Sequence, residues 1–261
     1  MMFSGKVVAV TGADGGIGRA LCSYFAGQGA AIAAIDKKPD VEGLVGDLER
    51  DGARVACAIA DVGDKDAVAQ AFGELGRKLG SIDVLVNNAG FSEHPTFSRT
   101  DPVAWHGDVN GNLNGAYYCA HAVIPGMQAK RAGSIIAISS VNGLAALGDP
   151  AYSAAKAGMI SLTRSLALEY GRFGIRANAV LPATVRTPLW QRRAAKDPTV
   201  LDKLVRWYPL GRIVDPIDVA RAVGFLASDA AAAITGIALP IDCGLSAGNI
   251  VMARELTLEE F

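Results

Sequence analysis

Seven short apolar runs are spaced along the chain, and segments with helical spacing separate them. Near-continuous hydrophobic strands that alternate with helices are typical of a parallel sheet covered on both faces. No linker, repeat or low-complexity tract divides the sequence. We therefore expect one doubly wound α/β domain of about seven strands over residues 1–261. The apolar runs are residues 7–10, 30–35, 54–60, 82–86, 134–139, 175–181 and 236–241, and the helical segments include residues 18–28, 64–79, 113–130 and 153–170.

Composition narrows the class of protein. Hydrophobic residues make up 51% of the chain and charged residues 20%, which allows a large buried core. The formal net charge of −1 argues against a nucleic-acid binder, which normally carries a basic surplus. No apolar run reaches the 18 residues that a membrane span needs, and the apolar stretch near residue 1 is too short for a signal peptide.

The four cysteines are scattered among apolar residues and form no CxxC pair. This pattern favours buried free thiols over disulfides or a metal site, and it predicts a reducing, cytoplasmic location. The cysteines are Cys22, Cys57, Cys119 and Cys243.

A glycine-rich loop, TGADGGIG at residues 11–18, follows the first apolar run and opens the first helical segment. Glycines at such a turn let the backbone approach a pyrophosphate, which then lies at the positive end of the helix. Asp36 stands at the end of the second run, where a carboxylate accepts hydrogen bonds from the hydroxyls of an adenosine ribose and repels a 2′-phosphate. Lys37 and Lys38 follow Asp36 and could pair with that phosphate. We interpret them as solvated loop charges, so the sequence predicts NAD rather than NADP. The loop residues expected to contact the cofactor are Gly12, Asp14, Gly15, Gly16, Ile17 and Gly18.

Tyr152 and Lys156 lie four residues apart in the segment AYSAAKAG, so a helix places both on one face. Taken alone, such a pair is most often a solvated helix face. A free phenol has a pKa of about 10, and a neighbouring ammonium group favours its ionised form. The pair is therefore also a candidate for general acid–base catalysis.

Together these motifs resemble those of the short-chain dehydrogenase/reductase family, and the resemblance runs over nearly the whole chain. Residues 11–18 fit the TGxxxGxG loop of that family, residues 87–90 its NNAG element, and residues 182–187 its PGxVxT segment. The family has a dinucleotide-binding (Rossmann) fold and a catalytic tetrad. The residues at the tetrad positions are Asn112, Ser140, Tyr152 and Lys156.

The resemblance implies a role for each of these residues. Tyr152 would be the general acid/base, and Lys156 would also hold the nicotinamide ribose. Ser140 would bind the reacting oxygen, and Asn112 would support a water that links Lys156 to solvent. Further cofactor contacts implied by the family are Asp61, Val62, Asn88, Ala89, Gly90, Pro182, Val185 and Thr187. No metal is implied.

Three departures from the family pattern stand out. Ala183 and Cys243 replace glycines, and the spacing from Ser140 to Tyr152 is one residue shorter than the usual thirteen. Spacing therefore favours Ser139 as the catalytic serine, whereas the motif favours Ser140. We choose Ser140, because a loop absorbs a deletion more easily than a buried strand changes its register.

Residues 188–210 occupy the place of the family's mobile substrate lid. Trp190, Trp207 and Tyr208 are expected to form its apolar inner face. The basic residues Arg192, Arg193 and Lys196 are expected on the outer face. In the competing interpretation these basic residues steer an anionic substrate.

The sequence thus predicts an oxidoreductase that transfers a hydride between NAD(H) and a small secondary alcohol or ketone. Two other enzyme hypotheses are a 3-oxoacyl-acyl-carrier-protein reductase and a sugar or polyol dehydrogenase; the non-enzymatic one is an NAD-binding sensor or scaffold. We expect a homotetramer, because helical segments 113–130 and 153–170 carry more apolar and small residues than one sheet contact requires. The tail ELTLEEF is expected either to cap the domain or to reach a neighbouring subunit.

Overall fold

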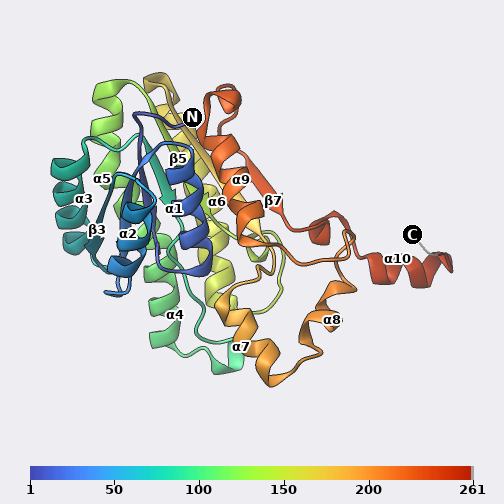
Figure 1. Cartoon of the computed structure of the whole chain (residues 1–261). Coiled ribbons are helices and arrows are strands. Elements are labelled where there is room, and N and C mark those ends of the chain that lie inside the picture. Colours follow the sequence, from blue (N-terminus) through green and yellow to red (C-terminus); the bar gives the residue numbers. More distant parts are fainter. Residues whose placement is uncertain (260–261) are drawn as a thin grey trace.

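The computed structural model describes residues 1–259, except for the side chains of Leu189, Gln191 and Arg192. Its centre is a seven-stranded sheet in the order β3-β2-β1-β4-β5-β6-β7, with every neighbouring pair parallel (Figure 1). The single doubly wound α/β architecture predicted from the sequence is confirmed. The strands are β1 Val7–Thr11, β2 Ala31–Asp36, β3 Val55–Ile59, β4 Val84–Asn87, β5 Gly133–Ile138, β6 Ile175–Pro182 and β7 Ala238–Ile241.

Helices cover both faces of this sheet because successive strand residues point to opposite sides. In β1, Val8 and Val10 pack with one apolar cluster, whereas Val7 and Ala9 pack with the other. The first cluster is completed by helices α1 Gly16–Gly27, α2 Val41–Arg50 and α9 Pro216–Ala227. The second face carries α3 Lys65–Leu79, α5 Gly115–Lys130 and α6 Pro150–Tyr170.

Local signals at the helix ends agree with the sequence. The Asp64 carboxylate accepts hydrogen bonds from the backbone amides of Asp66 and Ala67 and so caps α3. Asp101 caps α4 Pro102–Val109 in the same way, with proline at the first helical position. Between α4 and α5, residues Asn110–Asn114 form a turn of π-helix. Such turns often occur at functional sites.

The chain reverses its winding direction between β1 and β4. From β1 it moves outward to β2 and β3, and it then returns to pair β4 with the other side of β1. The loops after β1 and β4 therefore diverge, and a crevice opens at the carboxyl ends of the strands. In open α/β sheets this crevice is where ligands bind.

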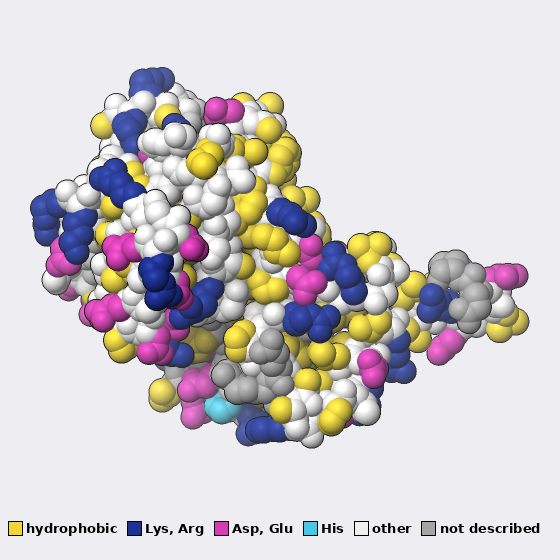
Figure 2. Space-filling model, in the orientation of Figure 1, with side chains coloured by type: hydrophobic (Ala, Val, Ile, Leu, Met, Phe, Trp, Pro, Cys, Tyr) yellow, Lys and Arg dark blue, Asp and Glu magenta, His cyan; other side chains and the backbone are white. Residues whose placement is uncertain are grey.

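The last third of the chain adds peripheral helices. Two short ones, α7 Pro188–Lys196 and α8 Val200–Val205, lie below the carboxyl edge of the sheet in Figure 1. The terminal helix α10 Ile250–Thr257 stands away from the body, and its Met252 and Leu256 are exposed (Figures 1 and 2). The part of the tail within residues 1–259 therefore does not cap the domain, and Glu260 and Phe261 lie outside the described residues. Within the same range, no helix is long and apolar enough to cross a membrane.

Gly18 is the glycine of α1 that the fold constrains most tightly. A Cβ added there would press on the carbonyl oxygen of Gly12 and lie 2.8 Å from the Ala13 Cα. We expect Gly18→Ala to lower the free energy of unfolding by about 2 kcal/mol or more, because these backbone atoms cannot yield without distorting the loop. Denaturant unfolding followed by circular dichroism measures the change.

Gly27→Ala in the same helix is the matched control. A Cβ at Gly27 meets nothing within 4 Å. Alanine has the higher helix propensity, so this variant should be neutral or more stable by up to about 1 kcal/mol. Equal behaviour of the two variants would contradict the close approach at Gly18.

Candidate active site

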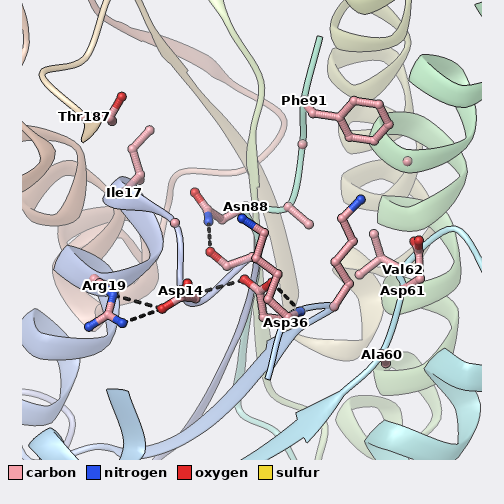
Figure 3. A pocket seen from close by; sticks show the side chains of 18 of the residues that line it. Asp14, Ile17, Arg19, Asp36, Ala60, Asp61, Val62, Asn88, Phe91 and Thr187 are labelled. Carbon is pink, nitrogen blue, oxygen red and sulfur yellow. Dashed lines mark hydrogen bonds and ion pairs between the residues drawn. The ribbon is translucent and has the colours of Figure 1, made fainter. Parts of the chain in front are cut away.

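A cavity of about 620 Å³ lies in the crevice at the carboxyl ends of the strands (Figure 3). The glycine loop and the ends of β2, β3 and β4 form its walls. Of the residues predicted to hold a cofactor, those that line it are Gly12, Asp14, Gly15, Gly16, Ile17, Asp36, Asp61, Val62, Asn88, Ala89, Gly90 and Thr187.

The other predicted cofactor residues lie outside this lining. Gly18 packs behind the loop against Gly12. Pro182 is buried at the end of β6, and Val185 is buried and bridges to Val214. The pair Tyr152 and Lys156 lies on α6, also outside the lining of this cavity.

Side chains from β1 and β4 fix the shape of the glycine loop. The Asn88 amide nitrogen donates hydrogen bonds to the carbonyls of Thr11 and Gly12, at 2.9 and 3.0 Å. The Thr11 hydroxyl in turn accepts hydrogen bonds from the backbone amides of Asn88 and Ala89. Gly12 has a φ of 62°, which a residue with a side chain rarely adopts. The loop is thus held rigidly open toward the cavity.

Asp36 occupies the end of β2 and is almost fully buried. Its Oδ2 accepts a hydrogen bond from the Asp14 amide at 3.0 Å, and its Oδ1 accepts one from the Lys38 amide at 3.1 Å. These bonds fix the carboxylate and leave each oxygen with a lone pair for another donor. Lys37 is directed elsewhere, with its ammonium 5.1 Å from the centre of the Phe91 ring.

The two candidate serines have different surroundings. The Ser139 hydroxyl is buried and donates to the carbonyl of Lys156 at 2.8 Å, which makes it a tie between β5 and α6. The Ser140 hydroxyl accepts a hydrogen bond from the Asn142 amide at 3.2 Å, and it lies near enough to the phenol of Tyr152 to lower the pKa of that group. The structure therefore brings Ser140, rather than Ser139, to Tyr152.

Lys156 is a buried lysine. Its ammonium donates to the Ile138 carbonyl at 2.9 Å and lies 5.3 Å from the centre of the Tyr152 ring. A neutral carbonyl does not offset the loss of hydration around a charge. Burial accordingly lowers the pKa of Lys156 to about 7.

The pKa of Tyr152 is raised above its usual value, chiefly by burial. The hydrogen bond with Ser140 lowers it, whereas the carboxylates of Asp149 and Asp108 raise it. Lys156, which the sequence predicted would lower this pKa, is not among the groups that shift it. The reason is physical: with a pKa of about 7, Lys156 has lost its proton at the higher pH where a phenol ionises, so it offers no positive charge to the phenolate.

Asn112 lies in the π-helical turn, where its side chain points at the loop after β4. Its amide nitrogen donates to the carbonyls of Phe91 and Asp108, each at 2.8 Å. Its Oδ1 is buried and has no partner among the described residues. A Cβ on Gly90 would lie 2.5 Å from this oxygen and 3.0 Å from the Lys156 nitrogen. Glycine at position 90 thus opens a space that Asn112 and Lys156 both border.

These observations fit a bound dinucleotide. The cavity has the size of a small-molecule site. A fixed carboxylate lies at one end of it, and a row of backbone amides opens the first helix beside it. Asn112 and Lys156 border the Gly90 space with an unpaired oxygen and a nitrogen.

Two acidic residues of the site were not predicted from the sequence. Asp108 is buried on α4 with a raised pKa, and its Oδ1 has no partner within the described chain. Asp149 precedes α6 in a left-handed conformation, with φ at 49°. A single Asp gives no signal of burial, so only the packing of α4 against α6 reveals that both influence Tyr152.

The predicted division of the lid into apolar and basic faces is wrong for the side chains described. The Arg193 guanidinium lies 4.6 Å from the centre of the Trp190 ring, so the two share one side of α7. Cation–π attraction explains this placement. Tyr208 is buried, and its hydroxyl accepts a hydrogen bond from the Thr184 amide, which fixes it to the body. Lys196 is exposed, and the Arg192 side chain lies outside the described residues.

The departures from the family glycines are visible in the backbone. Cys243 has a φ of 53°, a conformation in which a side chain costs energy and glycine does not. Its carbonyl accepts a hydrogen bond from the Leu210 amide, so the turn holds the end of the lid segment. Ala183 packs against the core without such a backbone demand.

Comparison with known proteins decides the family. A family model described as enoyl-(acyl carrier protein) reductase matches residues 12–246. A crystal structure of a short-chain dehydrogenase/reductase from Burkholderia thailandensis is 47% identical, covers 98% of each chain and superimposes with a TM-score of 0.90. The chain belongs to the short-chain dehydrogenase/reductase family. It is an oxidoreductase of a fold that binds nicotinamide cofactors.

Two further relatives of this dehydrogenase/reductase span nearly its whole length. An oxidoreductase of Schizosaccharomyces pombe is 43% identical, with 99% of this chain and 98% of the relative covered. A 3-oxoacyl-[acyl-carrier-protein] reductase of Thermotoga maritima is 37% identical, with 94% of this chain and 99% of the relative covered.

Removal of the buried charge at Lys156 should stabilise the unliganded protein. Methionine has a similar length and no charge, so we expect Lys156→Met to raise the free energy of unfolding below pH 7 by on the order of a few kcal/mol. At those pH values the folded and unfolded chains both hold the Lys156 proton, and the full cost of burial applies. Between pH 7 and about 10.5 only the unfolded chain keeps the proton, so the gain should shrink as pH rises.

Denaturant unfolding across this pH range measures the effect, and Lys203→Met is the control. Lys203 is exposed and pairs with Asp197 at 3.1 Å, so its replacement should change stability little. A Lys156→Met variant that is less stable at every pH would contradict the buried charge.

Proposed function

We propose that this protein oxidises a secondary alcohol, or reduces the corresponding ketone, with NAD(H) as cofactor. The observation that carries the proposal is the cluster around Tyr152: Ser140 lowers the pKa of its phenol, and the Lys156 nitrogen lies 5.3 Å from the centre of its ring. A sensor that only bound the cofactor would have no need for a buried lysine beneath a half-buried tyrosine.

Each residue of the cluster has a distinct task. Tyr152 takes the proton from the substrate hydroxyl during oxidation and returns it to the carbonyl oxygen during reduction. Ser140 holds that oxygen through its hydroxyl. Lys156, with a pKa of about 7, passes a proton between Tyr152 and a water held by the unpaired Oδ1 of Asn112. The nicotinamide ring supplies hydride transfer.

The residues proposed to hold the cofactor are those of the predicted set. The loop from Gly12 to Gly18 would bind the pyrophosphate through backbone amides at the start of α1. Asp61 and Val62 would border the adenine, and Asn88 to Gly90 the adjoining ribose. Pro182, Val185 and Thr187 would lie on the nicotinamide side.

The position of Asp36 supports NAD over NADP. Its fixed carboxylate offers a free lone pair on each oxygen to a ribose diol. The same charge repels a 2′-phosphate. Because Lys37 faces Phe91, it does not offset this repulsion.

The surroundings of Tyr152 support a neutral substrate. The carboxylates of Asp149 and Asp108 act electrostatically on the phenol. A substrate with negative charge near its reacting carbon would be repelled by both. We therefore favour a small or medium secondary alcohol with a hydrophobic or cyclic body, with a sugar or polyol as an alternative, and place the lid at residues 188–210 over it. The Thermotoga relative makes a 3-oxoacyl-acyl-carrier-protein substrate the second candidate.

We further propose a cytoplasmic homotetramer. All four cysteines are free thiols, and burial raises the pKa of Cys22 and Cys119 to about 12, which suits a reducing compartment. Tyr117 on α5 and Leu168 on α6 are exposed, as expected of helices that meet a second subunit. The projecting α10, with Met252 and Leu256 uncovered, would reach another copy.

Tyr152→Phe tests the proposed reaction. We expect NADH formation from a panel of secondary alcohols, followed by absorbance, to fall by at least about 100-fold, because general acid–base catalysis contributes 10²–10⁴-fold. NAD binding, titrated by fluorescence, should remain. Tyr24→Phe, at the far end of α1, should leave both unchanged. A Tyr152→Phe enzyme that kept a tenth of the wild-type kcat would refute the role of the phenol.

Ser140→Ala and Ser139→Ala form a matched pair at adjacent positions. We expect Ser140→Ala to lower kcat by about 100-fold or more, because its hydroxyl contacts the phenol. Ser139→Ala should keep most of kcat but lose about 1 kcal/mol of stability, since it removes the bond to the Lys156 carbonyl. Steady-state kinetics and thermal unfolding of both variants separate the roles, and the reverse result would assign catalysis to Ser139.

A further inference from the structure

Asp14 and Arg19 form an ion pair in the wall of the cavity. The Asp14 Oδ1 accepts a hydrogen bond from the Arg19 Nε at 3.0 Å and another from its Nη2. Both residues line the cavity next to Asp36, and Figure 3 shows the three side by side. The backbone amide of Asp14 also donates a hydrogen bond to the Asp36 carboxylate, so Asp14 contacts both Arg19 and Asp36.

Arg19 would otherwise suit a phosphate group. A guanidinium presents several N–H donors in a plane and binds phosphate oxygens in pairs. Here Asp14 occupies two of those donors, and Asp47 lies 4.0 Å from a third nitrogen. Arg19 therefore lies in the cavity wall near Asp36, and the Asp14 carboxylate already neutralises its positive charge.

The pair contributes little to stability. Arg19 is 44% exposed, and exposed ion pairs are worth at most about 1 kcal/mol. Its position beside Asp36 has a larger consequence. Without Asp14, the charged residues that line the cavity would be the cations Arg19, Lys37 and Lys38 and the carboxylates Asp36 and Asp61. With Asp14, a third carboxylate is present and the charge of Arg19 is neutralised.

We infer that Asp14 is a specificity-determining residue that disfavours 2′-phosphorylated adenosine. It acts by holding Arg19 in an ion pair and by adding a second negative charge beside Asp36. This inference rests on the NAD preference proposed above. It assigns part of that preference to Asp14, in addition to Asp36, the carboxylate proposed to bind the ribose.

The experiment measures binding, without catalysis. Adenosine 2′,5′-bisphosphate and ADP are titrated into the whole purified protein by calorimetry. We expect Asp14→Ser to bind the 2′-phosphorylated ligand at least tenfold more tightly than the wild type does, with ADP affinity changed less than threefold. The gain should fade as salt is added, because the new contact is electrostatic.

Two further variants assign the effect. Asp14→Ser combined with Arg19→Met should lose the gain, because the phosphate would have no guanidinium to bind. Asp47→Asn also removes a negative charge near Arg19 but lies outside the cavity lining, so it should show no gain. Circular dichroism checks the fold of each variant, and Asp14→Asn serves if the serine variant does not fold.

The outcomes separate this inference from the proposed function. No gain in either Asp14 variant, or a gain that persists without Arg19, would overturn the role of Asp14. Wild-type protein that binds the 2′-phosphorylated ligand as tightly as ADP would instead contradict the NAD preference itself.

Discussion

The parallel pairing of β1 with β2 on one side and β4 on the other is the constraint on which the site depends. Because the connections after β1 and β4 run to opposite faces of the sheet, their loops separate and leave a crevice. Asn88 and Thr11 then tie the two loops across the crevice floor. The same pairing brings Asp36, at the end of β2, to the glycine loop. A different strand order would scatter these residues.

A second feature is the buried lysine Lys156, which serves the proposed chemistry but lowers the stability of the fold. Lys156, on α6, is buried between β5 and the Gly90 space, where the neutral carbonyl of Ile138 accepts its hydrogen bond. Burial brings its pKa near neutrality, which is where a group that exchanges protons works best. The surrounding sheet and helices supply the stability that this placement removes. Activity and stability therefore oppose each other at this position.

The sequence predicted a large part of this arrangement, and the failures have identifiable causes. The apolar runs, separated by helical segments, predicted the strand positions and the parallel architecture. The main error was in the ends of the strands, which differ from the predicted ends by one or two residues. The sequence predicted that Lys156 lowers the pKa of Tyr152, whereas burial raises this pKa and Lys156 is not among the groups that shift it, because spacing reports proximity but not burial. The lid faces were wrong because Arg193 stacks on Trp190, a contact that helical spacing alone does not reveal.

By itself the sequence determined the fold class, the glycine loop, the carboxylate at Asp36 and the helical pairing of Tyr152 with Lys156. Each is local or periodic, so neighbouring residues suffice to specify it. Tertiary structure decided which serine meets the phenol, since Ser139 and Ser140 differ only in what packs around them. It also decided that Asp108 and Asp149 act on Tyr152, and that Asp14 binds Arg19 beside Asp36. Burial and charge balance depend on distant segments, and only the folded chain brings those segments together.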